Sequence, residues 1–231
     1  MSVSIEKTQQ QILKHHGGNG SQARQAISNS YDRRHDDDFW QFWDETVAAN
    51  HQTGDGIVDM GAGIGQFVRD CALRYPGSTV IGLEAAPYML EHTVELPNNA
   101  RIVQDDLNLP QADIAPGSVS MVMANMVVHE LTQPIKMFKA AYDWLKPGGR
   151  LCVVDVVRQP LKDYLEHRYT ETQVWGDDTT VADLEDAFEH FQEHNRYHPD
   201  DIVFMLELGG FKLVDRLSYR NDRFVRLVVE K

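Results

Sequence analysis

The sequence predicts an α/β fold built on a mostly parallel sheet with helices on both faces. Three observations support this prediction. Short β-branched runs alternate with amphipathic stretches of helical period, the runs are apolar throughout, and a glycine-rich segment joins the first run to the first amphipathic stretch. Strands that are buried on both faces are apolar throughout, and parallel strands need a crossover between them, usually a helix. The 231 residues are most simply one such domain.

The first fifty residues precede this alternation and have a different pattern. Residues 1–20 are polar and end in Gly-Gly-Asn-Gly, which favours a flexible break. From Ser21 to about Asn50 the apolar spacing is helical, with four aromatic residues between positions 39 and 43. We therefore expect an N-terminal helical segment over residues 1–50 and a main domain over residues 51–231.

In the main domain, short apolar runs bounded by turn residues are predicted to be strands. The predicted strands are Ile57–Met60, Thr79–Leu83, Arg101–Gln104, Val119–Ala124, Leu151–Val157, Phe211–Ser218 and Phe224–Val229. The predicted helices are Gln66–Tyr75, Pro87–Leu96, Gln133–Leu145 and a last one that His198-Pro199-Asp200 begins and Gly209-Gly210 ends. Residues 159–196 differ from the alternating pattern because they are helical, charged and rich in His and aromatic residues.

The charge balance excludes several classes of partner. Lys and Arg number 22 against 35 Asp and Glu, so the formal net charge is −13. Surfaces that bind phosphate backbones gather Lys and Arg, so we expect neither a nucleic-acid partner nor stable membrane association. The longest nearly apolar run, Val119–Val128, is about half of the ~20 residues that span a bilayer. With no secretion signal at the start, and with Cys71 and Cys152 predicted to be buried free thiols, we expect a cytoplasmic protein.

The glycine-rich segment is the most informative part of the chain. The strand Ile57–Met60 runs into Gly61, Gly63 and Gly65, and a helix follows. This G-x-G-x-G spacing departs from the G-x-G-x-x-G fingerprint of dinucleotide sites and suits a ligand without a pyrophosphate. Glu84 ends the second strand, where a carboxylate accepts hydrogen bonds from ribose hydroxyls. The segment therefore predicts a nucleoside-binding site.

With these features in place, the chain resembles class I S-adenosylmethionine-dependent methyltransferases from about Gly56 to Val157. The segments that carry the resemblance are Asp59–Gly65, Glu84, Gln104–Pro110, Asn125–Leu131 and Leu145–Arg150. The resemblance implies a Rossmann-like, doubly wound α/β fold of seven strands in the order 3-2-1-4-5-7-6, with the last strand antiparallel. It also implies that the N-terminal helical segment and a helical insertion at about 160–197, after strand five, form a lid over the carboxyl ends of the strands.

The same resemblance implies which residues hold the cofactor. In this family an Asp binds the adenine amine; Asp105 fits that role best by its distance from Pro110, and the adjacent Asp106 is an open alternative. The helix that follows the glycines offers N–H groups to the cofactor's carboxylate. The implied cofactor-binding residues are Asp59, Gly61, Ala62, Gly63, Gly65, Glu84, Ala85, Met89, Asp105, Asp106, Leu107 and Asn125.

Fewer residues point to the chemistry. His129 follows strand four, where the family places the methyl acceptor, and histidine titrates near neutral pH, so His129 is our candidate general base. A role in which His129 only packs or orients stays open. Tyr31 is a second catalytic candidate because it lies in the segment that covers the cofactor in similar enzymes; packing explains it equally well. The expected substrate-binding residues are His129, Arg158, Tyr164 and Arg168.

We therefore expect transfer of a methyl group from S-adenosylmethionine to a small molecule by in-line displacement, leaving S-adenosylhomocysteine. No metal is expected, because the His190, His194 and His198 repeat lacks a secure third ligand. The acidic runs of the two lid segments favour a neutral or cationic acceptor. The alternatives are an NAD-dependent oxidoreductase, for which Tyr142 and Lys146 have the right spacing, a protein or RNA methyltransferase, and a non-catalytic S-adenosylmethionine-binding protein. The sequence leaves the oligomeric state open, a homodimer being one option.

Overall fold

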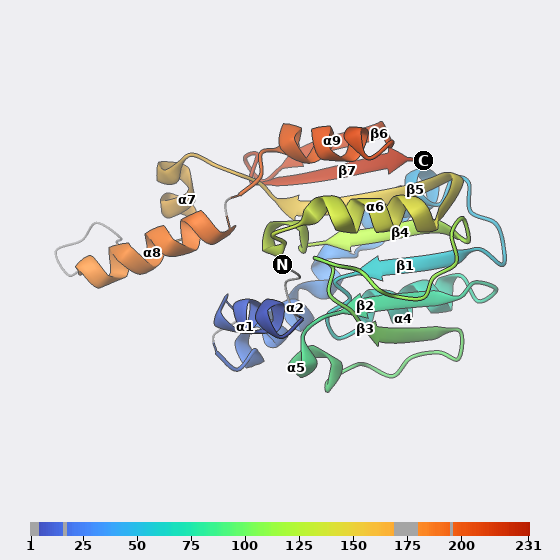
Figure 1. The fold of residues 1–231 in the computed structure, drawn as a ribbon, viewed down its shortest axis with the longest axis horizontal. Coiled ribbons are helices and arrows are strands. Elements are labelled where there is room, and N and C mark those ends of the chain that lie inside the picture. The colour runs from blue at the N-terminus through green and yellow to red at the C-terminus, as the bar shows by residue number, and fades with distance from the viewer. Residues whose placement is uncertain (1–4, 16–17, 169–179, 195) are drawn as a thin grey trace.

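A computed structural model describes residues 5–15, 18–168, 180–194 and 196–231. Its seven strands form one sheet in the order β3-β2-β1-β4-β5-β7-β6 (Figure 1). The strands are β1 (Gly56–Met60), β2 (Val80–Glu84), β3 (Ala100–Gln104), β4 (Val119–Asn125), β5 (Leu145–Val156), β6 (Lys212–Tyr219) and β7 (Phe224–Glu230). β7 is antiparallel to both of its neighbours, and the other pairs are parallel. The predicted strand order and the antiparallel last strand are confirmed.

Helical elements connect and flank the strands. In the described ranges they are α1 (Ile5–His15), α2 (Ser21–Arg34), α3 (Asp37–Phe42), the π-turn η1 (Trp43–Val47), α4 (Gln66–Arg74), α5 (Pro87–Leu90), the 3₁₀ turn η2 (Val128–Glu130), α6 (Pro134–Trp144), α7 (Leu161–Arg168), α8 (Val181–His194) and α9 (Pro199–Leu208). None of the described helices is long and apolar enough to cross a membrane.

The sheet is buried on both faces, as its uninterrupted apolar strands predict. Along β1, Val58 and Met60 pack in one cluster with residues of α6 and α9, while Ile57 packs in another with residues of α4 and η1. Neighbouring strands alternate in the same way, because successive side chains of a strand point to opposite faces. Two hydrophobic layers therefore hold the sheet in place and fix the positions of its strand ends.

The carboxyl ends of the parallel strands meet at one edge of the sheet. β1 lies at the centre, with β2 on one side and β4 on the other, so the chain changes winding direction beside β1. Ligands of open α/β sheets bind in the crevice at such a switch point. In Figure 1 the arrowheads of the parallel strands point toward this edge, where α1 and α2 lie.

The helical pattern expected from Ser21 to about Asn50 is divided into α2, α3 and η1. α2 ends at Arg34, and Asp36 caps α3 by accepting a hydrogen bond from the Phe39 N–H at 3.0 Å. The side chain of an N-cap Asp satisfies one of the free N–H groups at the start of a helix. Asp36 therefore begins a new helix, α3, and the helical segment is interrupted there. A further helix, α1, lies within residues 1–20, where the sequence predicted only a polar break.

Two boundaries in the main domain also differ. The helix expected over Pro87–Leu96 ends at Leu90, because the Thr93 hydroxyl bonds to the Leu90 carbonyl and the Val94 N–H bonds to Ile64 at 2.9 Å. β5 begins at Leu145 rather than Leu151, and its register against β4 shifts between Val119 and Met121. The predicted insertion contains α7 and α8, which project away from the body of the sheet in Figure 1.

Candidate functional site

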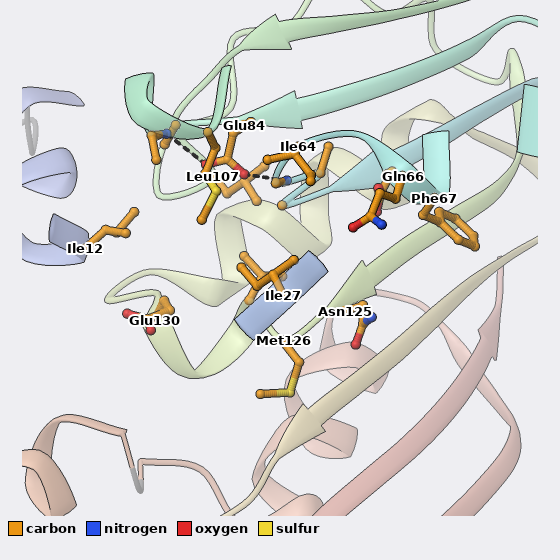
Figure 2. A pocket seen from close by; sticks show the side chains of 18 of the residues that line it. Ile12, Ile27, Ile64, Gln66, Phe67, Glu84, Leu107, Asn125, Met126 and Glu130 are labelled. Carbon is orange, nitrogen blue, oxygen red and sulfur yellow. Dashed lines mark hydrogen bonds between the residues drawn. The ribbon is translucent and has the colours of Figure 1, made fainter. Parts of the chain in front are cut away.

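A cavity of about 390 Å³ opens at the carboxyl edge of the sheet, under α1 and α2. The loop after β1, the ends of β2 and β4, and the turn η2 form its walls. The lining residues are Thr8, Ile12, Ile27, Ser30, Tyr31, Arg34, His35, Asp59, Gly61, Ala62, Gly63, Ile64, Gln66, Phe67, Glu84, Ala85, Ala86, Met89, Asp106, Leu107, Asn125, Met126, Val127, His129, Glu130 and Leu131. Figure 2 shows side chains from these elements converging on the cavity.

The glycine loop lies against this cavity, and its three glycines have different roles. Gly61 and Gly65 have φ values of +85° and +84°, and a Cβ there would lie 2.9 Å from Val127 and 2.5 Å from Ile102. Gly63 also has a positive φ, +56°, but a Cβ there would meet no atom within 4 Å. Gly61 and Gly65 therefore allow the loop to pack, whereas Gly63 leaves open space beside the cavity.

Glu84 organises the far side of the loop. Its carboxylate accepts the N–H of Gly63 at 2.7 Å and the N–H of Ala86 at 2.8 Å. Figure 2 shows both bonds as dashed lines, with Asn125 and Met126 across the cavity from Glu84. Burial raises the pKa of Glu84, and the hydrogen bonds oppose that shift. The carboxylate is thus fixed at the end of β2 with one edge toward the cavity.

Asp59 lies beside Glu84 at the end of β1. Burial, with a smaller effect of the Glu84 charge, raises the pKa of Asp59 to about 7. Burial and a neighbouring negative charge both disfavour the ionised form of a carboxyl group. A cation bound in the cavity would favour that form.

The two adjacent acids after β3 have separate roles. Asp105 accepts backbone N–H groups of Asp106, Gln111 and Ala112 at 2.9–3.0 Å, and it does not line the cavity. Asp106 lines the cavity and accepts the Thr8 hydroxyl of α1 at 2.8 Å. Asp106 also accepts the backbone N–H of Asn108 at 2.9 Å and its side-chain amide at 3.2 Å. Asp105 therefore shapes the loop, and Asp106 is the one of the two acids that faces the cavity.

Two further acceptors face the cavity without a hydrogen-bond partner in the described part of the chain. They are Gln66 Oε1 at the start of α4 and Asn125 Oδ1 at the end of β4, and both atoms are buried. An unsatisfied buried acceptor costs free energy until a donor reaches it. Together with Asp59, Glu84 and Asp106, these oxygens suit a ligand that is rich in N–H and O–H donors and carries positive charge.

His129 lies in η2 at the edge of the cavity. Its Nδ1 lies 2.5 Å from Asp155 Oδ1, and its Nε2 lies 3.3 Å from Glu130 Oε1. Asp155, fully buried on β5, also accepts the backbone N–H groups of residues 127–129. Burial lowers the pKa of His129, but its contacts with Asp155 and Glu130 outweigh burial and raise it to about 10. His129 is therefore an imidazolium at neutral pH.

Comparison with known proteins identifies the family of the chain. A family model described as a methyltransferase domain matches residues 58–153, which contain the glycine loop and Glu84. The arsenite methyltransferase of Halobacterium salinarum is 32% identical over 172 residues, which is 70% of this chain. The chain belongs to the class I S-adenosylmethionine-dependent methyltransferases.

Other relatives of this methyltransferase chain are more distant. The ubiquinone/menaquinone biosynthesis C-methyltransferase of Cereibacter sphaeroides is 25% identical over 179 residues, 73% of this chain and 69% of that protein. A methyltransferase bound to the Haloferax volcanii Trm112 activator shares the fold with a TM-score of 0.63 at 15% identity, covering 92% of this chain and 95% of that one. The chain spans only 38% of the length of the arsenite methyltransferase.

The N-terminal segment of the methyltransferase supplies lining residues that sequence reasoning missed, including Thr8, Arg34 and His35. Tyr31, a predicted site residue, lines the cavity with its ring, but its hydroxyl donates to Asp70 Oδ2 at 2.7 Å. Burial and this bond raise the pKa of Tyr31, so its hydroxyl stays protonated at neutral pH. Burial also lowers the pKa of His35 to about 4, which keeps that ring neutral.

Two of the other predicted substrate-binding residues, Arg158 and Tyr164, do not line the cavity. Arg158 is exposed after β5, and its backbone N–H bonds to the Tyr197 carbonyl at 2.8 Å. Tyr164 on α7 pairs with His190 on α8, outside the cavity lining. The Arg168 side chain lies outside the described residues. Within that description, no group of three His, Cys, Asp or Glu side chains could hold a metal.

The dehydrogenase-like spacing of Tyr142 and Lys146 forms no site. Tyr142 packs edge-on against Phe211 at 5.1 Å between ring centres, and Lys146 Nζ pairs with Asp55 at 2.6 Å. Neither residue lines the cavity. Tyr142 lies on α6 and Lys146 on β5, and each has a structural partner, so their spacing gives no support to an NAD-dependent oxidoreductase.

Proposed function

We propose that this chain transfers a methyl group from S-adenosylmethionine to a small molecule held in the cavity under α1 and α2. The observation that carries the proposal is the set of oxygen acceptors around the glycine loop, three carboxylates and two unpartnered amide oxygens. When bound, S-adenosylmethionine supplies an electrophilic methyl group on a positively charged sulfur.

Different lining residues bind different parts of the cofactor. Glu84, at the end of β2, accepts the ribose hydroxyls, as carboxylates do at this position in nucleotide-binding sheets. Asp106 accepts the exocyclic amine of adenine; it replaces Asp105, the residue favoured by the sequence, because Asp106 lines the cavity and Asp105 faces the loop amides. Gln66 and Asn125 accept the ammonium group of the amino-acid end, which satisfies both buried oxygens.

Positioning, rather than proton removal, accounts for the chemistry. In-line displacement needs the reacting atoms aligned at about 3–3.5 Å, and a rigid cavity supplies that alignment. His129 is protonated at neutral pH, so it has no lone pair with which to act as the general base expected from the sequence. We assign it instead as a positioning residue, because its two ring nitrogens are paired with Asp155 and Glu130.

A small acceptor fits the way the cavity is covered. Thr8 and Gln9 attach α1 to Asp106 and to the Ala85 carbonyl, both at 2.8 Å, so α1 serves as a lid. Distant relatives are named for arsenite and for ubiquinone or menaquinone biosynthesis. An arsenic acceptor has no support here, because trivalent arsenic is soft and prefers thiolates, whereas Cys71 and Cys152 are fully buried away from the cavity.

Labelled S-adenosylmethionine incubated with cell extract that has been separated by molecular size tests the proposal. Label should move into the small-molecule fraction, and Glu84→Ala should abolish the transfer. Label in protein or RNA would contradict a small acceptor. Binding of S-adenosylmethionine without transfer to any fraction would identify a non-catalytic binding protein, and fluorescence quenching by NADH would favour the oxidoreductase.

A further inference from the structure

One cation of the cavity lining is not explained by cofactor binding. Arg34, the last residue of α2, lines the cavity with a half-buried side chain. The other charged lining groups are the acids Asp59, Glu84 and Asp106 and the pair of His129 and Glu130. His129 lies between two carboxylates, whereas Arg34 is a lining cation whose bonds within the described residues go to backbone carbonyls and not to a carboxylate.

The hydrogen bonds of Arg34 are few and long. Its Nε donates to the Ser30 carbonyl at 3.4 Å, and its Nη2 donates to the Ile27 carbonyl at 3.3 Å. Both acceptors belong to its own helix, and no described carboxylate forms an ion pair with it. Buried guanidinium groups are normally paired with carboxylate or phosphate, because the loss of hydration is otherwise uncompensated. The group is therefore available to an anionic ligand.

A second cationic element stands near Arg34. The turn between β6 and β7 holds Arg220, Asn221 and Asp222 at φ values of +54°, +55° and +58°, a conformation unusual for side chains other than Gly. Arg220 and Arg223 lie over the Phe224 ring at 5.2 and 5.4 Å. Burial lowers the pKa of Arg34, and the charge of Arg220 adds to that effect. The charge of Arg220 thus adds positive potential on this side of Arg34.

This turn lies on the side of the sheet away from the cofactor acids. Its backbone is attached to the end of β5, where the Val157 N–H donates to the Arg223 carbonyl at 2.9 Å. Asp59 and Glu84 end β1 and β2, and Asp106 follows β3, on the other half of the strand order. The cofactor's carboxylate also has an expected partner elsewhere, the first-turn N–H groups of α4.

We propose that Arg34 binds an anionic group of the methyl acceptor, a carboxylate or a phosphate, and that the Arg220–Arg223 turn strengthens this preference. A guanidinium matches both groups with two parallel N–H donors, which also fixes the acceptor's orientation. The net charge of −13 favours a neutral or cationic acceptor at long range, but an unpaired local cation decides recognition inside the cavity. The identity of the anion as the acceptor rests on the proposed function.

Anion binding to the full chain tests this without a known substrate. NMR shifts are followed as succinate, inorganic phosphate or uncharged succinamide is added, with and without saturating S-adenosylhomocysteine. We expect succinate or phosphate, but not succinamide, to bind, and comparison of the two distinguishes a carboxylate from a phosphate site. Arg34→Gln should weaken that binding by about tenfold or more, Arg34→Lys by less, and Arg33→Gln, an exposed neighbour, by less than about twofold.

The cofactor titration separates the two proposals. Arg34→Gln should leave the Kd for S-adenosylhomocysteine within about twofold of wild type, since the guanidinium faces the acceptor. An equal loss of cofactor and anion affinity would place Arg34 on the cofactor's carboxylate and overturn the inference. Anion affinity that is unchanged in Arg34→Gln would also overturn it. If the wild type binds no S-adenosylhomocysteine, the proposed function fails, while the titrations without it still report on Arg34.

Any labelled product should be retained on an anion-exchange resin; a product that passes through also overturns the inference.

Discussion

At the scale of single residues, the cavity is defined by ionisable groups whose pKa values differ from those of free side chains. Asp59 and Glu84 are carboxyl groups that burial makes harder to ionise. His129 is an imidazole that Asp155 and Glu130 make harder to deprotonate. Perturbed groups gather at functional sites because binding and catalysis need charges that water would otherwise screen. These shifts lead to two measurable pH effects.

Asp59 should release a proton when S-adenosylmethionine binds. With a pKa of about 7, the Asp59 carboxyl is about half protonated at pH 7, and a cation in the cavity favours its ionised form. Calorimetry at pH 7 in buffers of different ionisation enthalpy should therefore detect release of up to about half a proton. Asp59→Asn should abolish that release, whereas Asp113→Asn, an exposed acid, should not. Equal buffer dependence in both variants would contradict the assignment.

His129 should make the fold less stable at alkaline pH. Its folded pKa is raised from 6.5 to about 10, so its protonated form stabilises the fold fully below pH 6.5. That contribution is lost as the pH rises from about 6.5 through about 10. Urea unfolding at pH 6.5 and pH 9.5 should show a drop of roughly a few kcal/mol in the wild type. His129→Gln should lose most of this drop and exposed His92→Gln should keep it; equal drops in all three would show that His129 is not the source.

At the scale of elements, the glycine loop and α1 bring the cavity residues together. The loop can turn only with positive φ values at its glycines, and two of the three also lack room for a Cβ. α1 contributes through two side-chain hydrogen bonds. Thr8 bonds to Asp106, 98 residues away in sequence, and Gln9 bonds to Ala85, 76 residues away. One element is thus rigid by backbone geometry, and the other is held by a few polar contacts.

Alanine at two of the glycines should separate folding from binding. Gly65→Ala places a Cβ 2.5 Å from Ile102 in a left-handed conformation, so it should cost roughly 1–3 kcal/mol of unfolding free energy. Gly63→Ala meets no neighbour, so its cost should be limited to the backbone strain of about 1–2 kcal/mol, while affinity for S-adenosylhomocysteine falls because the Cβ enters the space beside the cavity. Thermal unfolding and calorimetry measure the two effects. A Gly63→Ala variant with normal affinity would place the ligand elsewhere.

Removing one hydroxyl from α1 should weaken the cover of the cavity. Thr8→Val keeps the shape of a buried side chain but loses the bond that Thr8 donates to Asp106 and the longer one, 3.3 Å, that it accepts from Asn108. We expect the Kd for S-adenosylhomocysteine to rise by about three- to tenfold, since one hydrogen bond to a charged group is lost. Gln10→Ala, at an exposed position of α1, is the control. If both variants bind like the wild type, α1 is not part of the binding site.

At the scale of the whole molecule, the sequence predicts the sheet well and the N-terminal cover poorly. The apolar strands and the loop from Asp59 to Gly65 are local sequence patterns. They carry the resemblance to the methyltransferase family, and the strand order which that resemblance implied is the observed one. The contact of Thr8 with Asp106 and the cavity position of Arg34 depend on how α1 and α2 dock onto distant strand ends. No periodicity within residues 1–50 encodes that docking.

The choice between Asp105 and Asp106 illustrates the same limit within the main domain. Both are adjacent, acidic and buried, so spacing alone could not separate them. Only the three-dimensional loop, in which residues 111 and 112 fold back to donate to Asp105, places Asp106 rather than Asp105 at the cavity. The partner of His129 was missed for the same reason, because Asp155 comes from β5, 26 residues further along the chain.

The central claim is that the acceptor-rich cavity binds the adenosine-containing cofactor, and calorimetric titration of S-adenosylhomocysteine tests it most directly. We predict a 1:1 complex with a Kd of order micromolar in the wild type, weakened by about ten- to a hundredfold in Glu84→Ala through loss of the ribose contacts. Glu91→Ala, which removes an exposed carboxylate nearby, should bind like the wild type. No heat of binding at millimolar ligand, or equal affinity in Glu84→Ala, would contradict the account.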